Sequence, residues 1–299
     1  MKKAHDEIAS KSRDLNYNKF WFNNALELLR AQRVDPKNVL DVGAGKGEFL
    51  EILKNRFSIN KLVGIDYIDS DIDILKGKGI QPIKINLDNF EVSEYPQLKE
   101  SFDLVVCLET IEHVFNTDKL FQFFYYALKE NSYLVLSTPN SGALFYKLFY
   151  LIRGYPFGEN HHVRFFSYSK LRQYSFFNGF DVIMWNNFFE ISLDFVKRTF
   201  GLRQSILVKI LAGLLYGPFF LLNKLGIHNN SACSNFVVLL KKNSLPPLGL
   251  EIDNFRKNFF VLSEQQKSQW IERIKQYYKK DHLGEHIYFK AYIEELIGK

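Results

Sequence analysis

Three closely spaced glycines stand where a short apolar segment gives way to a helix-like one. The stretch reads Asp41-Val42-Gly43-Ala44-Gly45-Lys46-Gly47 and carries a carboxylate at its start. Glycine has no Cβ and tolerates positive φ, so glycines at such a turn let main-chain N–H groups approach a ligand closely. The stretch therefore predicts a turn that binds a nucleotide-like ligand.

The charges around this turn indicate which kind of nucleotide it would bind. The spacing is G-x-G-x-G, and Glu48 takes the place of the third glycine in the dinucleotide-binding pattern G-x-G-x-x-G. Asp41 and Glu48 would repel a pyrophosphate, whereas a cationic ligand is compatible with both. We therefore expect a nucleoside that carries positive charge.

A second carboxylate closes the next apolar run. Asp66 lies 23 residues beyond Gly43, where a ribose diol would lie in a nucleotide site. A carboxylate there can accept hydrogen bonds from both hydroxyls. The alternative, in which Asp66 only caps the helix that starts near Ser70, stays open.

These residues need a sheet to hold them, and the chain alternates short apolar runs with helix-like stretches. The apolar runs are 39–42, 61–65, 80–85, 102–107, 132–136, 180–185 and 235–241. The first helix-like stretches between them are 46–55, 70–77, 90–99 and 117–129. Continuously apolar strands separated by helices are typical of parallel strands that are buried on both faces. The pattern predicts an α/β fold with a doubly wound sheet.

Four segments together resemble the class I S-adenosylmethionine-dependent methyltransferases. They are Val39–Gly47, Val63–Asp66, Phe102–Val114 and Tyr133–Asn140. The most similar branch contains ubiquinone-pathway O-methyltransferases and many glycan and natural-product methyltransferases. The resemblance covers about residues 35–242. It implies a Rossmann-like seven-stranded sheet with insertions after strands 5 and 6, and S-adenosylmethionine as the cofactor.

The resemblance also implies a set of cofactor-binding residues. They are Asp41, Gly43, Ala44, Gly45 and Gly47 for the amino acid end, Asp66 for the ribose, Asn86 with Leu87 for the adenine side and Glu109 for the sulfonium side. A shift of register that puts Asp88 in place of Asn86 stays open.

Histidines supply the candidate catalytic groups. His113, just after the fourth strand, is the candidate base because imidazole titrates near neutral pH; a structural role as a helix cap stays open. His162 is a second catalytic candidate, and His161 and Arg164, in a segment that resembles the family's H-x-R-F-F-S motif, would bind the acceptor. Adjacent histidines in a loop do not by themselves converge on a metal, so we expect no metal site there.

Composition and charge limit the other functions. The chain has 299 residues, a net charge of +6, 46% hydrophobic residues and two cysteines, which is typical of a globular domain without a zinc or disulfide framework. Residues 141–243 carry 12 Lys and Arg against 4 Asp and Glu, but in no compact cluster, so nucleic acid is not the expected partner. The polar start of the chain has no secretory h-region, and we expect a cytoplasmic protein.

The domain organisation follows from the long interruptions of the pattern. We expect an N-terminal helical lid over residues 1–34 and a methyltransferase domain over 35–243 with insertions at 138–166 and 187–232. A linker and a helical C-terminal appendage would fill residues 244–299. Connections as long as the two insertions are usually functional.

The second insertion contains a strongly apolar stretch, residues 206–222. It is too short for a typical spanning helix, contains Lys209 and is expected to break at Gly217-Pro218, so we reject a transmembrane span. Two interpretations remain. Residues 204–224 would either lie in the interface of an anionic membrane, or form a cap helix that roofs a hydrophobic acceptor pocket.

The sequence thus predicts a methyltransferase that uses S-adenosylmethionine and acts on a small-molecule or lipid-linked acceptor, quinone-like or glycan, with oxygen as the favoured position. Two alternatives remain at this point. One is a Rossmann-type NAD(P)-dependent oxidoreductase, which the glycine spacing disfavours, and the other is a methyltransferase fold that serves as a non-catalytic scaffold.

Overall fold

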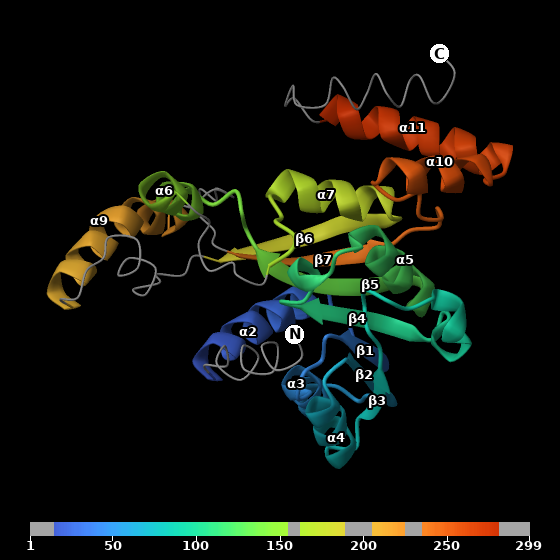
Figure 1. The fold of residues 1–299 in the computed structure, drawn as a ribbon, viewed down its shortest axis with the longest axis horizontal. Coiled ribbons are helices and arrows are strands. Elements are labelled where there is room, and N and C mark those ends of the chain that lie inside the picture. The colour runs from blue at the N-terminus through green and yellow to red at the C-terminus, as the bar shows by residue number, and fades with distance from the viewer. Residues whose placement is uncertain (1–14, 155–161, 189–204, 225–234, 281–299) are drawn as a thin grey trace.

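The computed structural model describes residues 15–154, 162–188, 205–224 and 235–280. Within these residues, seven strands form one sheet in the order β3-β2-β1-β4-β5-β7-β6 (Figure 1). The strands are β1 Asn38–Val42, β2 Lys61–Asp66, β3 Gln81–Lys84, β4 Phe102–Leu108, β5 Leu128–Pro139, β6 Phe180–Phe188 and β7 Asn235–Lys242. The predicted α/β fold with a doubly wound sheet is confirmed.

The strand order creates a switch point beside β1. The five neighbouring strands β3, β2, β1, β4 and β5 run parallel to one another. Strand β1 pairs with β2 on one side and with β4 on the other, so that Leu40 lies opposite both Val63 and Val105. The chain therefore reverses its direction of winding between β1 and β4, and ligands of open α/β sheets bind beyond the carboxyl ends of strands at such a point. Strand β7 is antiparallel to both β5 and β6.

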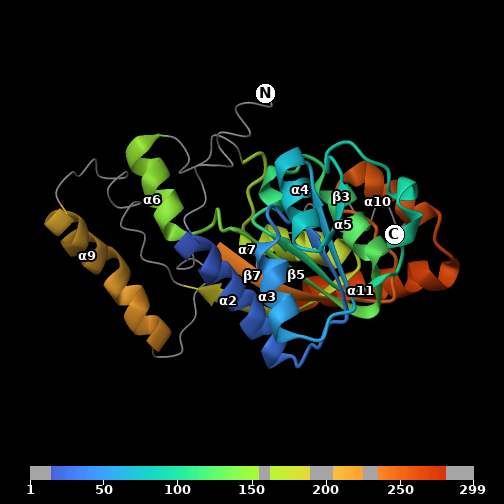
Figure 2. The same ribbon diagram turned by 90° about the horizontal axis from the view of Figure 1, so that it is seen from below.

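Helices cover both faces of the sheet (Figures 1 and 2). The helices are α2 Leu15–Ala31, α3 Glu48–Arg56, α4 Asp69–Gly77, α5 Thr117–Ala127, α6 Leu144–Arg153, α7 Tyr168–Phe177, α9 Ser205–Lys224, α10 Ile252–Phe260 and α11 Glu264–Lys280. Helices α2, α3 and α4 pack their apolar residues on one face. Helices α5, α7, α10 and α11 belong to the hydrophobic core on the other face.

The N-terminal and C-terminal helices are tied to this core. In α2, Trp21 and Leu29 are buried against the sheet. The stretch expected to be a linker is also packed, with Leu248 buried and the Trp270 indole N–H donating to the Pro246 carbonyl over 3.1 Å. The carboxylate of Asp118 in α5 accepts main-chain N–H bonds from Leu250 and Glu251. The division at residues 34 and 243 and the role of a lid stay predictions.

Two segments differ from what their sequence predicts. The helix expected over 90–99 is instead a pair of 3₁₀ turns, η1 Val92–Glu94 and η2 Pro96–Leu98. Proline lacks the N–H that a continuing helix needs, which explains why the first turn ends before Pro96. The break expected at Gly217-Pro218 was wrong, because α9 runs through Pro218. A proline removes one main-chain bond and can be accommodated inside a helix.

Helices α6 and α9 extend beyond the end of the sheet (Figures 1 and 2). No helix among the described residues has the length and apolar content that crossing a bilayer requires. We call α6 and α9 together the apolar helix pair, because their exposed side chains are mostly apolar. These are Leu144, Tyr150, Leu151 and Ile152 in α6, and Ile206, Leu207, Ile210, Leu214 and Leu221 in α9.

Candidate active site

The glycine turn, residues 43–47, links β1 to α3 and depends on its glycines. Gly43, Gly45 and Gly47 all have positive φ, of 81°, 52° and 74°. At Gly43 there is also no room for a side chain, since an added Cβ would lie 2.2 Å from Thr110 Oγ1. The N–H groups of Gly43 and Ala44 both donate to the Ile65 carbonyl over 2.9 Å, which fixes the turn on the end of β2.

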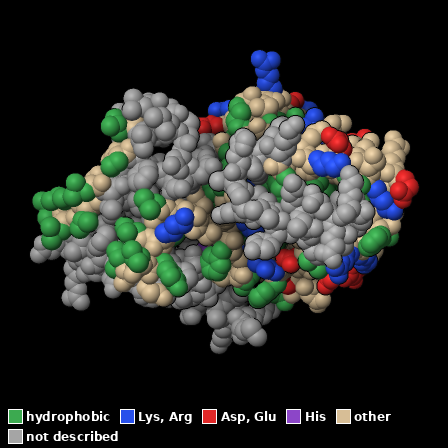
Figure 3. Space-filling view, turned by 90° about the horizontal axis from the view of Figure 1, so that it is seen from above, with side chains coloured by type: hydrophobic (Ala, Val, Ile, Leu, Met, Phe, Trp, Pro, Cys, Tyr) green, Lys and Arg blue, Asp and Glu red, His purple; other side chains and the backbone are tan. Residues whose placement is uncertain are grey.

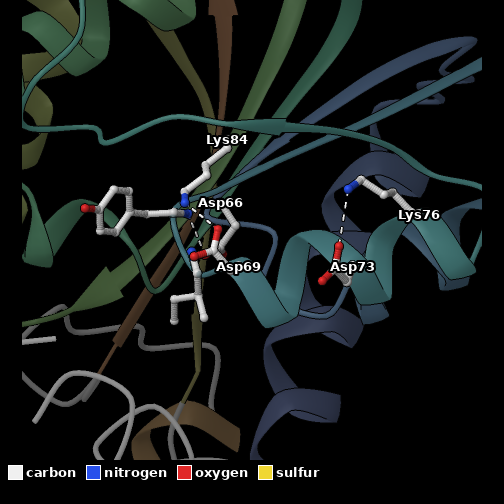
Figure 4. A network of polar contacts seen from close by, with 7 residues as sticks. Asp66, Asp69, Asp73, Lys76 and Lys84 are labelled. Carbon is white, nitrogen blue, oxygen red and sulfur yellow. Dashed lines mark hydrogen bonds and ion pairs between the residues drawn. The ribbon is translucent and has the colours of Figure 1, made fainter. Parts of the chain in front are cut away.

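Asp66 at the end of β2 faces the glycine turn. Its Oδ2 accepts the Gly45 N–H over 2.8 Å. Its Oδ1 accepts the N–H groups of Tyr67 and Ile68 over 2.7 and 3.0 Å (Figure 4). The N-cap of α4 is Ile68, so the bonds to Tyr67 and Ile68 lie ahead of the first turn of that helix. The bond to Gly45 connects Asp66 to the glycine turn.

Tyr67 and Lys84 lie next to Asp66 and were not singled out from the sequence. The Tyr67 ring is exposed, and Lys84 Nζ lies 5.6 Å from its centroid while pairing with the Asp69 carboxylate (Figure 4). Their positions follow from the pairing of β2 with β3, which sets Asp66 opposite Lys84. No local sequence motif predicts how β2 and β3 pair.

Asp41 in β1 is buried beneath the turn and is 4% exposed. Burial, followed by the nearby charge of Asp66, raises the pKa of Asp41 from 3.8 to about 8. A carboxyl group in this state carries a proton at neutral pH, and a cation placed beside it would favour its ionised form. The site is therefore suited to a positively charged group.

The loop after β4, residues 109–114, faces the glycine turn across the switch point. Glu109 adopts a left-handed conformation with φ of 50°, which a non-glycine residue adopts only when its surroundings hold it. Its Oε1 accepts the hydroxyl of Ser137 over 2.7 Å. Glu112 is 2% exposed, and its Oε2 accepts the Thr138 hydroxyl over 3.1 Å. Burial and the charge of Glu109 raise the pKa of Glu112 well above its usual range.

The structure brings the two predicted catalytic histidines together. The rings of His113 and His162 meet edge to face with centroids 4.9 Å apart. His113 Nε2 lies 3.9 Å from Glu112 Oε1, which is within ion-pair distance but longer than a hydrogen bond. The Glu112 carbonyl accepts the N–H groups of Val163 and Arg164, and these bonds hold the His162 segment against the loop.

The same three side chains form a set of ligand atoms. One atom each of Glu112, His113 and His162 lies within 4.8 Å of the others. One carboxylate and two imidazoles can bind a divalent transition metal. From the sequence, we discussed a metal only for the adjacent histidines His161 and His162, and His161 lies outside the described residues. The expectation of no metal stays a prediction.

Arg164 and the loop after β3 are joined through the main chain of one residue, Phe115. The Arg164 guanidinium donates to the Phe115 carbonyl from Nε over 2.9 Å and also from Nη2. The Phe115 N–H donates to Asp88 Oδ1 over 2.7 Å. Asn86 is exposed and its Oδ1 accepts the Asp88 N–H. The adenine-side role of Asn86 with Leu87 and the acceptor-binding role of Arg164 stay predictions.

Comparison with known proteins identifies the family. The model of a methyltransferase domain matches residues 14–184, more than half of the chain. The chain belongs to this methyltransferase family. The methyltransferase is 27% identical over 182 residues to the ubiquinone biosynthesis O-methyltransferase of Coxiella burnetii, covering 59% of this chain and 76% of that relative. It is 29% identical over 167 residues to the enzyme of the same name from Saccharophagus degradans, covering 50% and 68%.

Structural comparison supports the fold of the methyltransferase. The methyltransferase partner in a solved complex with the Haloferax volcanii Trm112 methyltransferase activator matches with a TM-score of 0.55 and 12% identity, over 80% of this chain and 97% of that one. An identity this low is informative about the fold alone. The family assignment favours methyl transfer over the NAD(P)-dependent alternative.

S-adenosylmethionine is the cofactor of this family, and the residues present fit it. The carboxylate of Asp66 suits a ribose diol, and the buried carboxyl of Asp41 suits an ammonium group. The glycine turn presents main-chain atoms without side chains at the carboxyl end of β1. The residue-by-residue assignment to parts of the cofactor stays a prediction.

Proposed function

We propose that this methyltransferase transfers the methyl group of S-adenosylmethionine to a hydroxyl of a small-molecule or lipid-linked acceptor, quinone-like or glycan. The observation that carries the proposal is the group formed by His113, His162 and the buried Glu112 at the carboxyl edge of β4. In this proposal the acceptor approaches the donor from the side of this group. Two relatives named as ubiquinone biosynthesis O-methyltransferases support oxygen as the acceptor atom.

The bound donor supplies an already activated methyl group, so the protein has to position the acceptor, exclude water and remove one proton. In this proposal His113 takes the proton from the acceptor hydroxyl. The carboxyl of Glu112, 3.9 Å away, favours the protonated imidazole when it is ionised. The ring of His162 packs edge to face on His113 and limits its rotation. Arg164 and His161 would bind the acceptor.

The apolar helix pair favours an acceptor at a lipid surface. Neither α6 nor α9 contains Asp or Glu, and Lys147 and Lys209 are exposed on them. Hydrophobic side chains gather at the end of the molecule that carries these helices (Figure 3). Apolar side chains with interspersed Lys bind the interface of an anionic membrane. We infer peripheral contact through residues 204–224 and a place on the cytoplasmic face of the membrane.

A labelled methyl donor tests the proposed reaction. Purified protein is incubated with the donor and either a polyprenylated catechol in vesicles or a soluble glycan, and label in the acceptor is counted. We expect label in the lipid acceptor. His113→Ala should lower turnover by about 10² while leaving donor affinity within twofold, because a general base contributes about that much.

Two outcomes would contradict the proposal. Full turnover by His113→Ala would show that His113 is not the base. Donor binding without label in any hydroxyl acceptor, in the presence or absence of divalent metal, would instead support the non-catalytic scaffold. The variant His113→Gln is the matched control, because it keeps a polar side chain of similar size but cannot take a proton near neutral pH.

A further inference from the structure

The end of β5 presents two adjacent hydroxyls to the loop after β4. Ser137 and Thr138 are both 0% exposed. The Ser137 hydroxyl donates to Glu109 Oε1, and the Thr138 hydroxyl donates to Glu112 Oε2. One strand end thus contacts both acidic side chains of the loop.

Ser137 holds Glu109 at two points. Its hydroxyl donates to the carboxylate over 2.7 Å and accepts the Glu109 N–H over 3.0 Å, and its carbonyl lies 3.2 Å from the same nitrogen. A left-handed conformation is costly for glutamate, so these bonds offset part of that cost. Hydrogen bonds to a carboxylate are also stronger than those between neutral groups.

The other side of Glu109 is fixed by the next residue. Thr110 Oγ1 donates to the Leu108 carbonyl over 3.0 Å and packs on Gly43, where an added Cβ would lie 2.2 Å away. The backbone at Glu109 is therefore confined between the glycine turn and the end of β5. A carboxylate confined at this edge has its charge fixed in place before a ligand arrives, which is what electrostatic preorganisation requires.

We propose that Ser137 is a positioning residue for the methyl donor. Its hydroxyl holds the Glu109 carboxylate toward the cationic sulfonium, so that the enzyme binds the charged donor more tightly than the neutral product. The proposal rests on the proposed function and on the predicted role of Glu109 on the sulfonium side of the cofactor. Methyl transfer itself does not require the enzyme to bind the donor more tightly than the product, so this preference is a further property of the site.

Paired affinities for S-adenosylmethionine and S-adenosylhomocysteine test the proposal, because the two differ in the methyl group and its positive charge. We expect Ser137→Ala to weaken binding of the donor by about three- to tenfold and to change binding of the product by less than twofold. Chelator in the buffer keeps divalent cations away from Glu112 and the two histidines. Calorimetric titration gives both constants on the full chain.

Four further variants make the result specific. Ser175→Ala is the matched control, since Ser175 is equally buried and its hydroxyl donates only to the Leu171 carbonyl in α7. Glu109→Gln removes the charge and should reproduce the loss of donor affinity. The double variant Ser137→Ala with Glu109→Gln should be no weaker than Glu109→Gln alone, because Ser137 acts through that charge. Ser137→Thr should restore the preference for the donor.

Other outcomes overturn the proposal. An equal loss of donor and product affinity in Ser137→Ala would show a structural role alone. Additive losses in the double variant would show that Ser137 acts independently of Glu109. If Ser137→Ala does not fold, Glu109→Gln tests the proposal instead. An unchanged ratio of donor affinity to product affinity in Glu109→Gln would show that the charge of Glu109 does not favour the donor. Methyl transfer itself would survive each of these results, so failure here leaves the proposed reaction intact.

Discussion

The carboxyl edge of β1, β2 and β4 and the apolar helix pair are built on opposite principles. At the edge, the carboxyl groups of Asp41 and Glu112 are both buried, and that of Glu112 accepts the Thr138 hydroxyl. In the helix pair, Leu151 and Leu214 are 80% and 71% exposed. Burying an acid destabilises its charged form, and exposing an aliphatic side chain keeps it in water, so each arrangement is costly in isolation. This difference motivates our proposal that each region binds a different ligand: a cation at the edge, and an apolar surface at the helices.

The glycine turn gives the largest expected effect. Gly43→Ala should weaken binding of S-adenosylmethionine by about 100-fold or more, because the new Cβ meets Thr110 as well as an unfavourable φ. The matched control is Gly79→Ala, which has a φ of 68° and nothing within 4 Å of the added Cβ. The control should lose only stability, measured by denaturant unfolding. Equal binding by both variants would contradict the role assigned to the turn.

The apolar helix pair gives an intermediate effect. Leu214→Asp should reduce binding to anionic vesicles by about tenfold, because it places a charge on the exposed apolar face of α9. Val261→Asp is the control, since Val261 is 80% exposed but follows α10 in the C-terminal region. Sedimentation with vesicles measures both. If the wild-type protein does not sediment with anionic vesicles, the other interpretation is favoured, in which α9 is a cap helix over the acceptor pocket.

The buried acid at the edge gives the most specific effect, because it depends on one titrating group. Since the pKa of Asp41 is about 8, its carboxyl is protonated below that pH in the unliganded protein. Binding a cation should release this proton, so donor affinity should rise by up to about tenfold per pH unit between about pH 6 and 7.5. Asp41→Asn should flatten this dependence. Calorimetry in buffers with different ionisation enthalpies measures the released proton, and a flat wild-type profile would refute the assignment.

The stability of the unliganded protein should have the opposite pH dependence. In the unfolded chain the pKa of Asp41 is near its ordinary value of 3.8, whereas the folded protein holds the proton until about pH 8. The folded state therefore binds more protons between these values, and its stability falls as the pH rises through this window. Asp41→Asn should remove this part of the fall in denaturant unfolding.

Local patterns were sufficient to predict one side of the site. Alternating apolar runs predicted the sheet, and glycine spacing predicted the turn at 43–47, because strand burial and positive φ depend on nearby residues. Motifs singled out His113 and His162 one by one, but the contact between their rings was not predicted. Cys107 is buried, and Cys233 lies outside the described residues.

Contacts between distant segments were not predictable in the same way. The bonds of Ser137 to Glu109 and of Arg164 to Phe115 join residues 28 and 49 positions apart. They depend on strand register and on the path of the segment after β5. The local spacing of residues predicts neither the strand register nor that path. In helix α9 a local signal gave the wrong prediction. Pro218 predicted a break, but the helix continues through it.

A titration of the unmodified chain with S-adenosylmethionine, followed by a challenge with NADH, tests the central claim most directly. The claim is that the glycine turn and its carboxylates bind a cationic nucleoside. We expect saturable binding of S-adenosylmethionine at one site and no displacement by NADH. Displacement by NADH, or no binding of S-adenosylmethionine at all, would contradict the account.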